Sequence, residues 1–124
     1  LEEQNRLSEE RRRNRALLNR YPNKQAHDNE RAEALAQVGG AVKSASTRLE
    51  ELVRKRVAID LEMEFYKGDV SKAPAHLRRQ VEENTQSQAV QKRFISEQDA
   101  EARRVNARFD DELARLLEKI GVKL

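Results

Sequence analysis

Apolar residues recur at alternating steps of three and four between residues 35 and 66. This spacing places them on one face of an α-helix and is typical of a helix that packs along a second helix. Only Arg56 interrupts the seam with a charge. The pattern therefore predicts one long helix, whose seam consists of Leu35, Val38, Val42, Ala45, Leu49, Leu52, Ile59, Met63 and Tyr66.

The residues after Pro74 repeat this spacing less regularly. Their seam begins with two apolar residues, continues with three polar ones and then becomes mainly apolar. Its members are Leu77, Val81, Asn84, Gln88, Gln91, Ile95, Gln98, Ala102, Val105, Phe109 and Leu116. A second long helix with a partly polar seam is therefore predicted.

Two breaks divide the chain into three predicted helices. Tyr21 ends the first, because Pro22 pushes the residue before it out of the helical conformation. Gly68 suits the left-handed position just past a helix end, and Pro74 suits the first turn of the next helix. No segment reads as a strand. The predicted helices span residues 2–20, 24–67 and 74–120.

The two long helices are expected to fold back on each other about the turn at residues 68–74. Paired positions then have numbers that add to about 144, which places Arg56 opposite Gln88. Asn84 and Gln91 lie one layer away on either side. The polar positions of the two seams meet in this register, which favours antiparallel pairing. A shift of the register would place the charge of Arg56 against apolar residues, which is costly. The predicted fold is an all-α antiparallel coiled-coil hairpin with an additional N-terminal helix, in a single domain of residues 1–124.

Gly39 and Gly40 lie inside the predicted middle helix, where two glycines cost roughly 2 kcal/mol relative to two alanines. In the predicted register they face Arg104 and Val105, one layer from Phe109. Three interpretations stay open: a close approach of a bulky side chain to the backbone, a kink or hinge, and a ligand site.

The C-terminal segment carries more apolar surface than one facing helix can cover, because its counterpart around residues 20–31 is mostly polar. Two coverings stay open: the first helix of the same chain, or a second copy of the protein. We expect a homodimer. Its candidate contacts, with a protein partner or a second copy, are Leu17, Leu18, Tyr21, Leu113, Leu116, Leu117 and Ile120.

The composition favours an extended helical architecture. Of 124 residues, 38% are charged and 37% hydrophobic, which argues against a large globular enzyme. The chain has no cysteine, so disulfides, thiolate metal sites and thiol nucleophiles are excluded. No stretch approaches the roughly 18 consecutive apolar residues of a transmembrane helix. The net charge of +3 arises from interleaved charges of both signs, a pattern typical of solvated helix faces.

One basic cluster in the first helix could contact phosphate groups or anionic lipid. Four glutamates dilute its charge, and no aromatic residue is interleaved for stacking on bases. A solvated helix or a protein contact is therefore preferred, with anion binding as the alternative. The candidate anion contacts are Arg6, Arg11, Arg12, Arg13, Arg15 and Arg20.

Candidate chemistry is sparse. His27 and Glu30 share one helical face, but a metal site needs three or four converging ligands. His76 follows Pro74 and is interpreted as a solvated residue of a helix start. No nucleophile-histidine-carboxylate grouping, phosphate-binding glycine loop or pair of buried carboxylates can be placed. We therefore predict no catalytic residues, no metal, no cofactor and no enzymatic activity.

Several short motifs are spread over residues 7–117. They are NRALLNRYP at residues 14–22 with His27-Asp28, EFYKG at 64–68, AHLRRQ at 75–80, RFI at 93–95 and VNARFD at 105–110. Together they resemble the helical C-terminal region of small exported proteobacterial proteins that begin with a signal peptide and a short Cys-containing domain of unknown function. The resemblance implies a periplasmic or envelope location, and a signal and N-terminal domain that this chain lacks. It implies no catalytic or binding residues, and Gly39-Gly40 and residues 120–124 depart from its pattern.

The sequence as a whole predicts a structural role: a spacer, adaptor or oligomerisation module that binds a protein partner or a second copy. The rival is a basic helical module that binds nucleic acid or an anionic membrane surface through the arginines of the first helix. The two differ in salt dependence, because electrostatic binding weakens steeply as ionic strength rises and apolar association does not.

Overall fold

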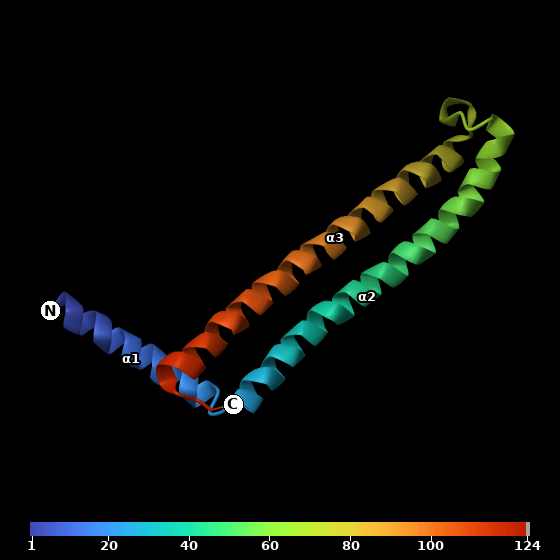
Figure 1. Cartoon of the computed structure of the whole chain (residues 1–124). Coiled ribbons are helices and arrows are strands. Elements are labelled where there is room, and N and C mark those ends of the chain that lie inside the picture. Colours follow the sequence, from blue (N-terminus) through green and yellow to red (C-terminus); the bar gives the residue numbers. More distant parts are fainter. Residues whose placement is uncertain (124) are drawn as a thin grey trace. The chain divides into compact units, whose positions relative to one another are not determined.

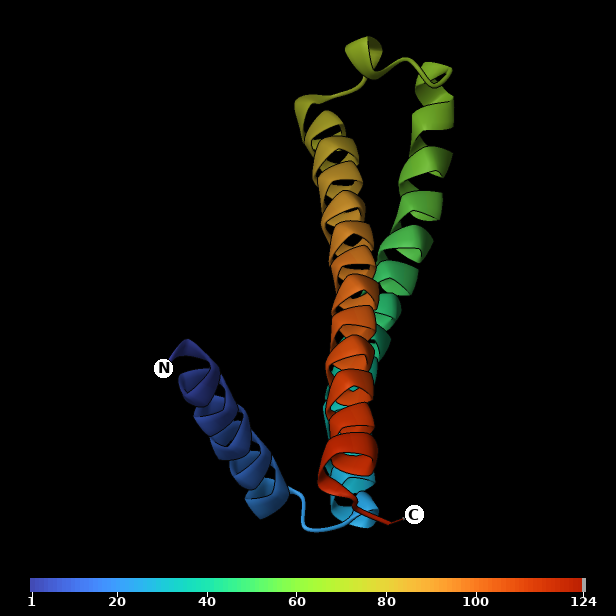
Figure 2. The same cartoon turned by 60° about the vertical axis from the view of Figure 1, so that its left-hand side comes forward.

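The computed structural model describes residues 1–123, which are helical apart from short connections and contain no strand. The predicted all-α fold is confirmed (Figure 1). Between residues 39 and 100, α2 and α3 run antiparallel as the arms of a helical hairpin (Figure 2). The elements are α1 (Glu2–Arg20), α2 (Lys24–Met63), the 3-10 turns η1 (Glu64–Tyr66) and η2 (Val70–Lys72), α3 (Ala75–Ala114) and the π-helical η3 (Arg115–Ile120).

The chain forms two compact units, and both long helices contribute to each of them. Unit 1 consists of Leu1–Val38 and Glu101–Leu124, and unit 2 consists of Gly39–Ala100. Each unit has an apolar core of its own. The prediction of a single domain stays a prediction.

The first predicted break is confirmed. The N–H of Tyr21 donates to the carbonyl of Leu17 at 2.8 Å, and Tyr21 then leaves the helical conformation with φ −127°. Asn23 begins α2, because its side-chain oxygen accepts from the N–H of Ala26 at 2.8 Å. This bond satisfies one of the free donors at the helix N-terminus.

The hairpin turn begins earlier than predicted. α2 ends at Met63 rather than at residue 67, and η1 follows directly. Lys67 and Gly68 are both left-handed, with φ of 54° and 74°, and the N–H of Gly68 donates to the carbonyl of Met63 at 3.0 Å. Asp69 begins η2 by accepting from the N–H of Ser71 at 3.0 Å. Hydrogen bonds from Ser71 hold the pKa of the Asp69 carboxyl below its usual value.

The predicted pairing register is wrong by about one helical turn. Arg56 forms no hydrogen bond with Gln88: it donates to the side chain of Thr85 at 2.8 Å and to the backbone carbonyl of Val81 at 3.3 Å, both earlier in α3. The cause is the turn. Because α2 unwinds after Met63, about one turn before its predicted end, every paired position on α3 moves by a similar distance.

A polar layer nevertheless forms in unit 2, as predicted, although with other partners. Asn84 is buried, donates to the carbonyl of Leu52 at 2.8 Å and accepts from Gln88 at 2.8 Å. Buried polar groups are costly unless they are hydrogen-bonded, so the layer favours the one register that brings Asn84 level with Leu52. Nearer the turn, the core continues with Met63, Ala73 and Leu77, against which Ile59, Tyr66 and Val81 pack.

The glycine pair lies inside α2, which stays helical through both residues. A Cβ atom at Gly39 or Gly40 would have no neighbour within 4 Å. The expected close approach of a bulky side chain is therefore wrong, because the space beside both glycines is open. The kink or hinge and the ligand site stay predictions.

Candidate interaction surfaces

Unit 1 is held together by one apolar core. Tyr21, Phe109 and Leu116 are its buried members. Gly121 is left-handed, with φ 82°, and the N–H of Val122 donates to the carbonyl of Leu116 at 2.9 Å. This closing turn brings Val122 back onto the core. The partly buried residues that pack there are Leu17, Ala34, Val105, Ile120 and Val122.

The predicted partner or dimer contacts are mostly used within the chain. Tyr21 and Leu116 are buried, with 1% and 0% of their surface exposed, and Leu18 exposes 38%. The others are half-buried: Leu17, Leu113, Leu117 and Ile120. Of the two coverings that the sequence leaves open, the structure shows the first, because α1 packs against η3. The homodimer stays a prediction, and Tyr21 and Leu116 have no free surface to contribute to it.

His27 is fully buried in unit 1, which the sequence does not predict. Its ring packs edge-on against two aromatic rings, with centroids 4.8 Å from Tyr21 and 5.1 Å from Phe109. Its Nε2 lies 3.3 Å from a carboxylate oxygen of Glu112, and its Nδ1 has no hydrogen-bond partner. One signal does point to this burial: the steps of three and four in the α2 seam continue backward from Val38 through residues 34 and 31 to His27.

Tyr21 buries a hydroxyl group that has no hydrogen-bond partner. Burial raises the pKa of this phenol above its usual value, and the nearby carboxylates of Glu112 and Glu30 raise it further. The phenolate is thus disfavoured in the folded state, while the phenol itself leaves a polar atom unsatisfied. The aromatic ring contributes to the core, and the hydroxyl group does not.

We expect Tyr21→Phe to raise the free energy of unfolding by about 1 kcal/mol, because it removes a buried polar atom without a partner. The wild type should also lose stability above the ordinary tyrosine pKa of about 10, since its folded-state pKa is raised and ionisation then favours unfolding. Urea unfolding at about pH 8 and about pH 11 measures both effects.

Tyr66→Phe is the matched control, because it retains the phenol of Tyr21 and should keep the alkaline loss of stability. A Tyr21→Phe variant as sensitive to alkali as the Tyr66→Phe variant would show that the Tyr21 hydroxyl is not the group responsible.

Polar contacts at the surface of unit 1 join its helices. Arg31 of α2 donates to Asn106 at 2.9 Å and to Asp110 at 2.8 Å, both on α3. Arg115 of η3 donates to Asn14 of α1 at 2.9 Å. These bonds orient α1 and the end of α3 around the aromatic core.

The six candidate anion contacts are not equally free. Arg6 pairs with Glu3 at 2.8 Å. Arg20 pairs with Glu30, and this bond from Arg20 lowers the pKa of the Glu30 carboxyl. The other four are exposed and form no ion pair within residues 1–123: Arg11, Arg12, Arg13 and Arg15.

An open groove of about 670 Å³ runs between α1 and the end of α3. Arg13 and Arg20 line it, so the structure brings two of the six candidates to one place. Three acidic side chains and two further basic ones from α3 and η3 also line the groove, so its positive charge is mostly balanced. Its further lining residues are Ala16, Leu17, Asp111, Glu112, Ala114, Arg115, Glu118 and Lys119.

An apolar ridge without a partner follows α2 in unit 2. Val53, Val57 and Leu61 come at steps of four on one side of α2, and Phe65 follows at the same step in η1. Their exposed fractions are 47%, 58%, 58% and 87%. We call these four residues the α2 ridge. A row of large exposed side chains differs from the single exposed apolar residues that are normal on a monomer.

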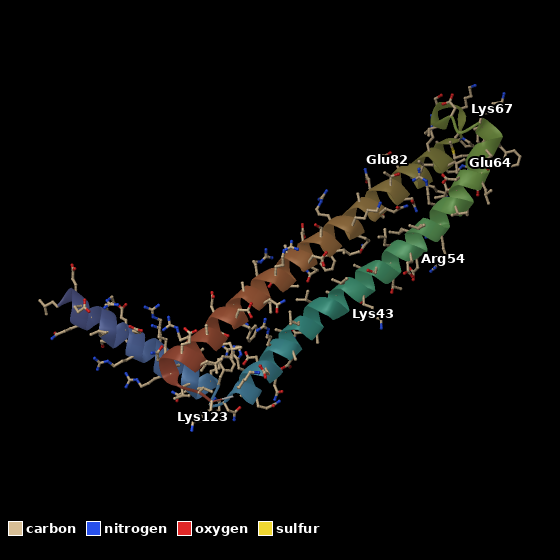
Figure 3. All side chains as sticks on the ribbon, in the orientation of Figure 1. Lys43, Arg54, Glu64, Lys67, Glu82 and Lys123 are labelled. Atoms are coloured by element: carbon tan, nitrogen blue, oxygen red, sulfur yellow. The ribbon has the colours of Figure 1, made fainter. Side chains whose placement is uncertain are left out.

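The α2 ridge faces away from α3. The buried residues Leu52 and Met63, by contrast, pack on the side of α2 that faces α3. Lys43 and Arg54 have the helical spacing of the ridge side, and Figure 3 shows both projecting from the side of α2 away from α3. Sequence reasoning missed the ridge, because its residues lie between the seam positions and only the tertiary contacts tell the two faces apart.

Charged residues of both signs lie beside the α2 ridge. Glu50 and Asp60 of α2 and Glu64 of η1 each lie three residues from one ridge member and seven from another. The basic residues on this side are Lys43 and Arg54. Asp60 accepts from Arg56 at 3.0 Å, whereas Glu50 and Glu64 form no ion pair with the described side chains.

Residues 1–123 contain neither a membrane-spanning helix nor a cluster of metal ligands. Over this range, no helix combines the length and the apolar character needed to cross a membrane. Within the same range, the histidine, aspartate and glutamate side chains do not gather in groups of three that could hold a metal ion. His27 contacts Glu112, whereas Glu30 contacts Arg20. The structure therefore does not bring His27 and Glu30 together as a pair of metal ligands. His76 is exposed in the first turn of α3, as predicted.

Comparisons with protein-family models, with curated proteins and with solved structures found no match. The resemblance to exported proteobacterial proteins therefore stays a prediction.

Proposed function

We propose that this chain is a non-enzymatic helical module that binds another protein through the α2 ridge. The observation that carries the proposal is the row of four large apolar side chains, each of them 47–87% exposed. Three lie on the side of α2 that α3 leaves free, and Phe65 follows them in η1. Burying such a side chain contributes roughly 1–2 kcal/mol when about half of it is already covered. Together the four would supply the apolar contacts that a partner helix buries.

The construction of unit 2 supports this role. The polar layer of Asn84 and Arg56 favours one register between the helices, so the far side of α2 presents the ridge in a defined arrangement. A preformed surface binds at a lower entropic cost than one that must be ordered on binding. A spacer or adaptor needs such a surface.

Three finer features belong to the same proposal. The alternating three-four seams favour coiled-coil packing of α2 against α3. A homodimer would use Leu18, which stays exposed at 38%, rather than the buried Tyr21 and Leu116. A periplasmic or envelope location follows from the family resemblance alone.

The rival function is anion binding by α1, and one observation favours it. Arg11, Arg12, Arg13 and Arg15 are exposed and form no ion pair with the described residues. They could therefore contact nucleic acid or anionic lipid without breaking an internal bond. Four glutamates in the same helix weaken this alternative.

Photo-crosslinking in cells that naturally produce the chain tests the two functions. A photoreactive side chain at position 57 should form protein adducts, and Leu61→Lys should abolish them because it places a charge in the ridge. The same probe at Glu51, on another side of α2, is the matched control and should form few adducts. Adduct yield at position 57 should change little between low and high salt.

Adducts with nucleic acid or lipid, formed from a probe at position 12 and lost as salt rises, would contradict the proposal and support the rival. The same conclusion would follow if Leu61→Lys left the protein adducts at position 57 unchanged.

A further inference from the structure

We infer that Gly39 and Gly40 form a joint at which α2 opens locally while α3 stays helical and the core of each unit stays folded. The inference goes beyond the proposed function, because it concerns how stability is distributed along the fold and not what the α2 ridge binds. The juxtaposition that carries it is a pair of exposed glycines where the two units meet in the sequence, in the part of α2 that has no buried residue.

The glycine pair has no role in packing that would explain it. A Cβ atom at either position would have no neighbour within 4 Å, and neither residue has a positive φ. Alanine would therefore fit the space and the backbone at both positions. What remains is the intrinsic effect of glycine, which disfavours the helical state because glycine loses more conformational freedom on ordering than any other residue.

The glycines lie where apolar burial is poorest along both long helices. In α2 no residue between His27 and Ala45 is buried, and in α3 none between Asn84 and Phe109 is buried. His27 and Phe109 belong to unit 1, whereas Ala45 and Asn84 belong to unit 2. Because tertiary packing supplies most of the stability of a helix in a protein, these stretches are the ones that open most easily.

Polar contacts do not compensate for this thin packing in α2. Arg31 bonds to Asn106 and Asp110, and Arg48 bonds to Glu51. Between Arg31 and Arg48, no side chain of α2 forms a hydrogen bond or an ion pair with the described residues. Local unfolding of this segment therefore breaks few contacts other than its own helical hydrogen bonds.

The corresponding stretch of α3 is better suited to stay helical. Residues 85–108 contain neither glycine nor proline, and they include several alanines, which have the highest helix propensity. Glu101 also accepts from Arg104 at 2.7 Å on the surface of this helix. Opening is therefore expected in α2 alone.

The opened state is a minor one, because α2 is helical through both glycines. Its formation would release three half-buried residues of the α2 seam, Leu35, Val38 and Val42. For as long as it lasts, α3 would be the single continuous helix that joins the two units.

Amide hydrogen exchange of the full chain, followed residue by residue, tests the inference. The N–H groups of residues 41–44 should exchange at least about tenfold faster than those of residues 50–59 in the same helix, after correction for their intrinsic rates. Residues 92–103 of α3 should exchange as slowly as residues 50–59, since the opening is confined to α2.

Gly39→Ala with Gly40→Ala should remove this difference, because two such changes favour the helical state about 30-fold. Asn29→Ala with Thr47→Ala is the matched control. It raises helix propensity at two exposed positions of α2 on either side of the joint, and should leave residues 41–44 the faster to exchange.

Three outcomes would overturn the inference. Equal exchange of residues 41–44 and 50–59 in the wild type would show that α2 does not open at the glycines. Equally fast exchange of residues 92–103 would show that thin packing of both helices, rather than the glycine pair, sets the opening. If the control pair slowed residues 41–44 as much as the alanines at the joint, general helix propensity would be responsible. None of these outcomes concerns the α2 ridge, so the proposed function would stand.

Discussion

Phe109→Ala is expected to lower the free energy of unfolding of unit 1 by about 3–5 kcal/mol. Phe109 has 0% of its surface exposed and forms the core of unit 1 with Tyr21 and Leu116. Its ring also packs edge-on against His27, and the guanidinium of Arg108 lies 4.5 Å from its centroid. Removing the ring leaves a cavity where the helices of the unit meet, and that cavity cannot close without moving them.

Urea unfolding followed by circular dichroism measures the total loss, and amide hydrogen exchange in residues 21–38 and 101–116 locates it in unit 1. Phe65→Ala is the matched control, since the same change at a side chain that is 87% exposed should cost less than about 0.5 kcal/mol. A loss below about 1 kcal/mol for Phe109→Ala would show that the core of unit 1 is not organised around this ring.

Gly39→Ala with Gly40→Ala is expected to raise the free energy of unfolding by about 2 kcal/mol, because each alanine favours the helix by roughly 1 kcal/mol. Both glycines lie inside α2, and a Cβ atom at either one would have no neighbour within 4 Å. The gain therefore comes without a steric penalty. Thermal and urea unfolding of the double variant measure it.

Gly68→Ala is the control with the opposite sign. A Cβ atom there would also have no neighbour within 4 Å, but φ is +74°. A side chain in this left-handed conformation costs roughly 1 kcal/mol, so the variant should be destabilised. If the double variant at Gly39 and Gly40 were destabilised as well, the glycines would be needed for a conformation of α2 other than the helical one, as the hinge interpretation requires.

Much of the fold follows from local sequence signals. The helix ends at Tyr21-Pro22 and the left-handed Gly68 are confirmed, because proline and glycine act on the backbone of their own or a neighbouring residue. The long helices are confirmed, because a period of three and four persists over many turns and tolerates single exceptions such as Arg56.

The register of the hairpin could not be read from the same pattern. It depends on where α2 unwinds, and the end at Met63 differs from the prediction by about one turn. A seam with a regular repeat pairs almost equally well after such a shift. The bonds from Asn84 to Leu52 and from Arg56 to Thr85 distinguish the registers, and they exist only in the assembled unit.

The candidate surfaces were predicted only in part. The arginines of α1 are visible as a cluster in the sequence, but the ion pairs that occupy Arg6 and Arg20 are not. The burial of His27 was missed although the residue has the helical spacing of the α2 seam, because the polar stretch around it does not indicate the two aromatic rings that enclose it.

The sequence by itself determined that the protein is helical, where its three helices begin and that the two long ones meet through a partly polar seam. These features depend on residues a few positions apart, whose interactions are present in any arrangement of the chain. The tertiary structure alone decided that Tyr21 and Leu116 are covered from within, that Asn84 is level with Leu52 and that Val57 is left exposed. Those outcomes depend on contacts between segments that are distant in sequence, and such contacts exist only once each unit is assembled.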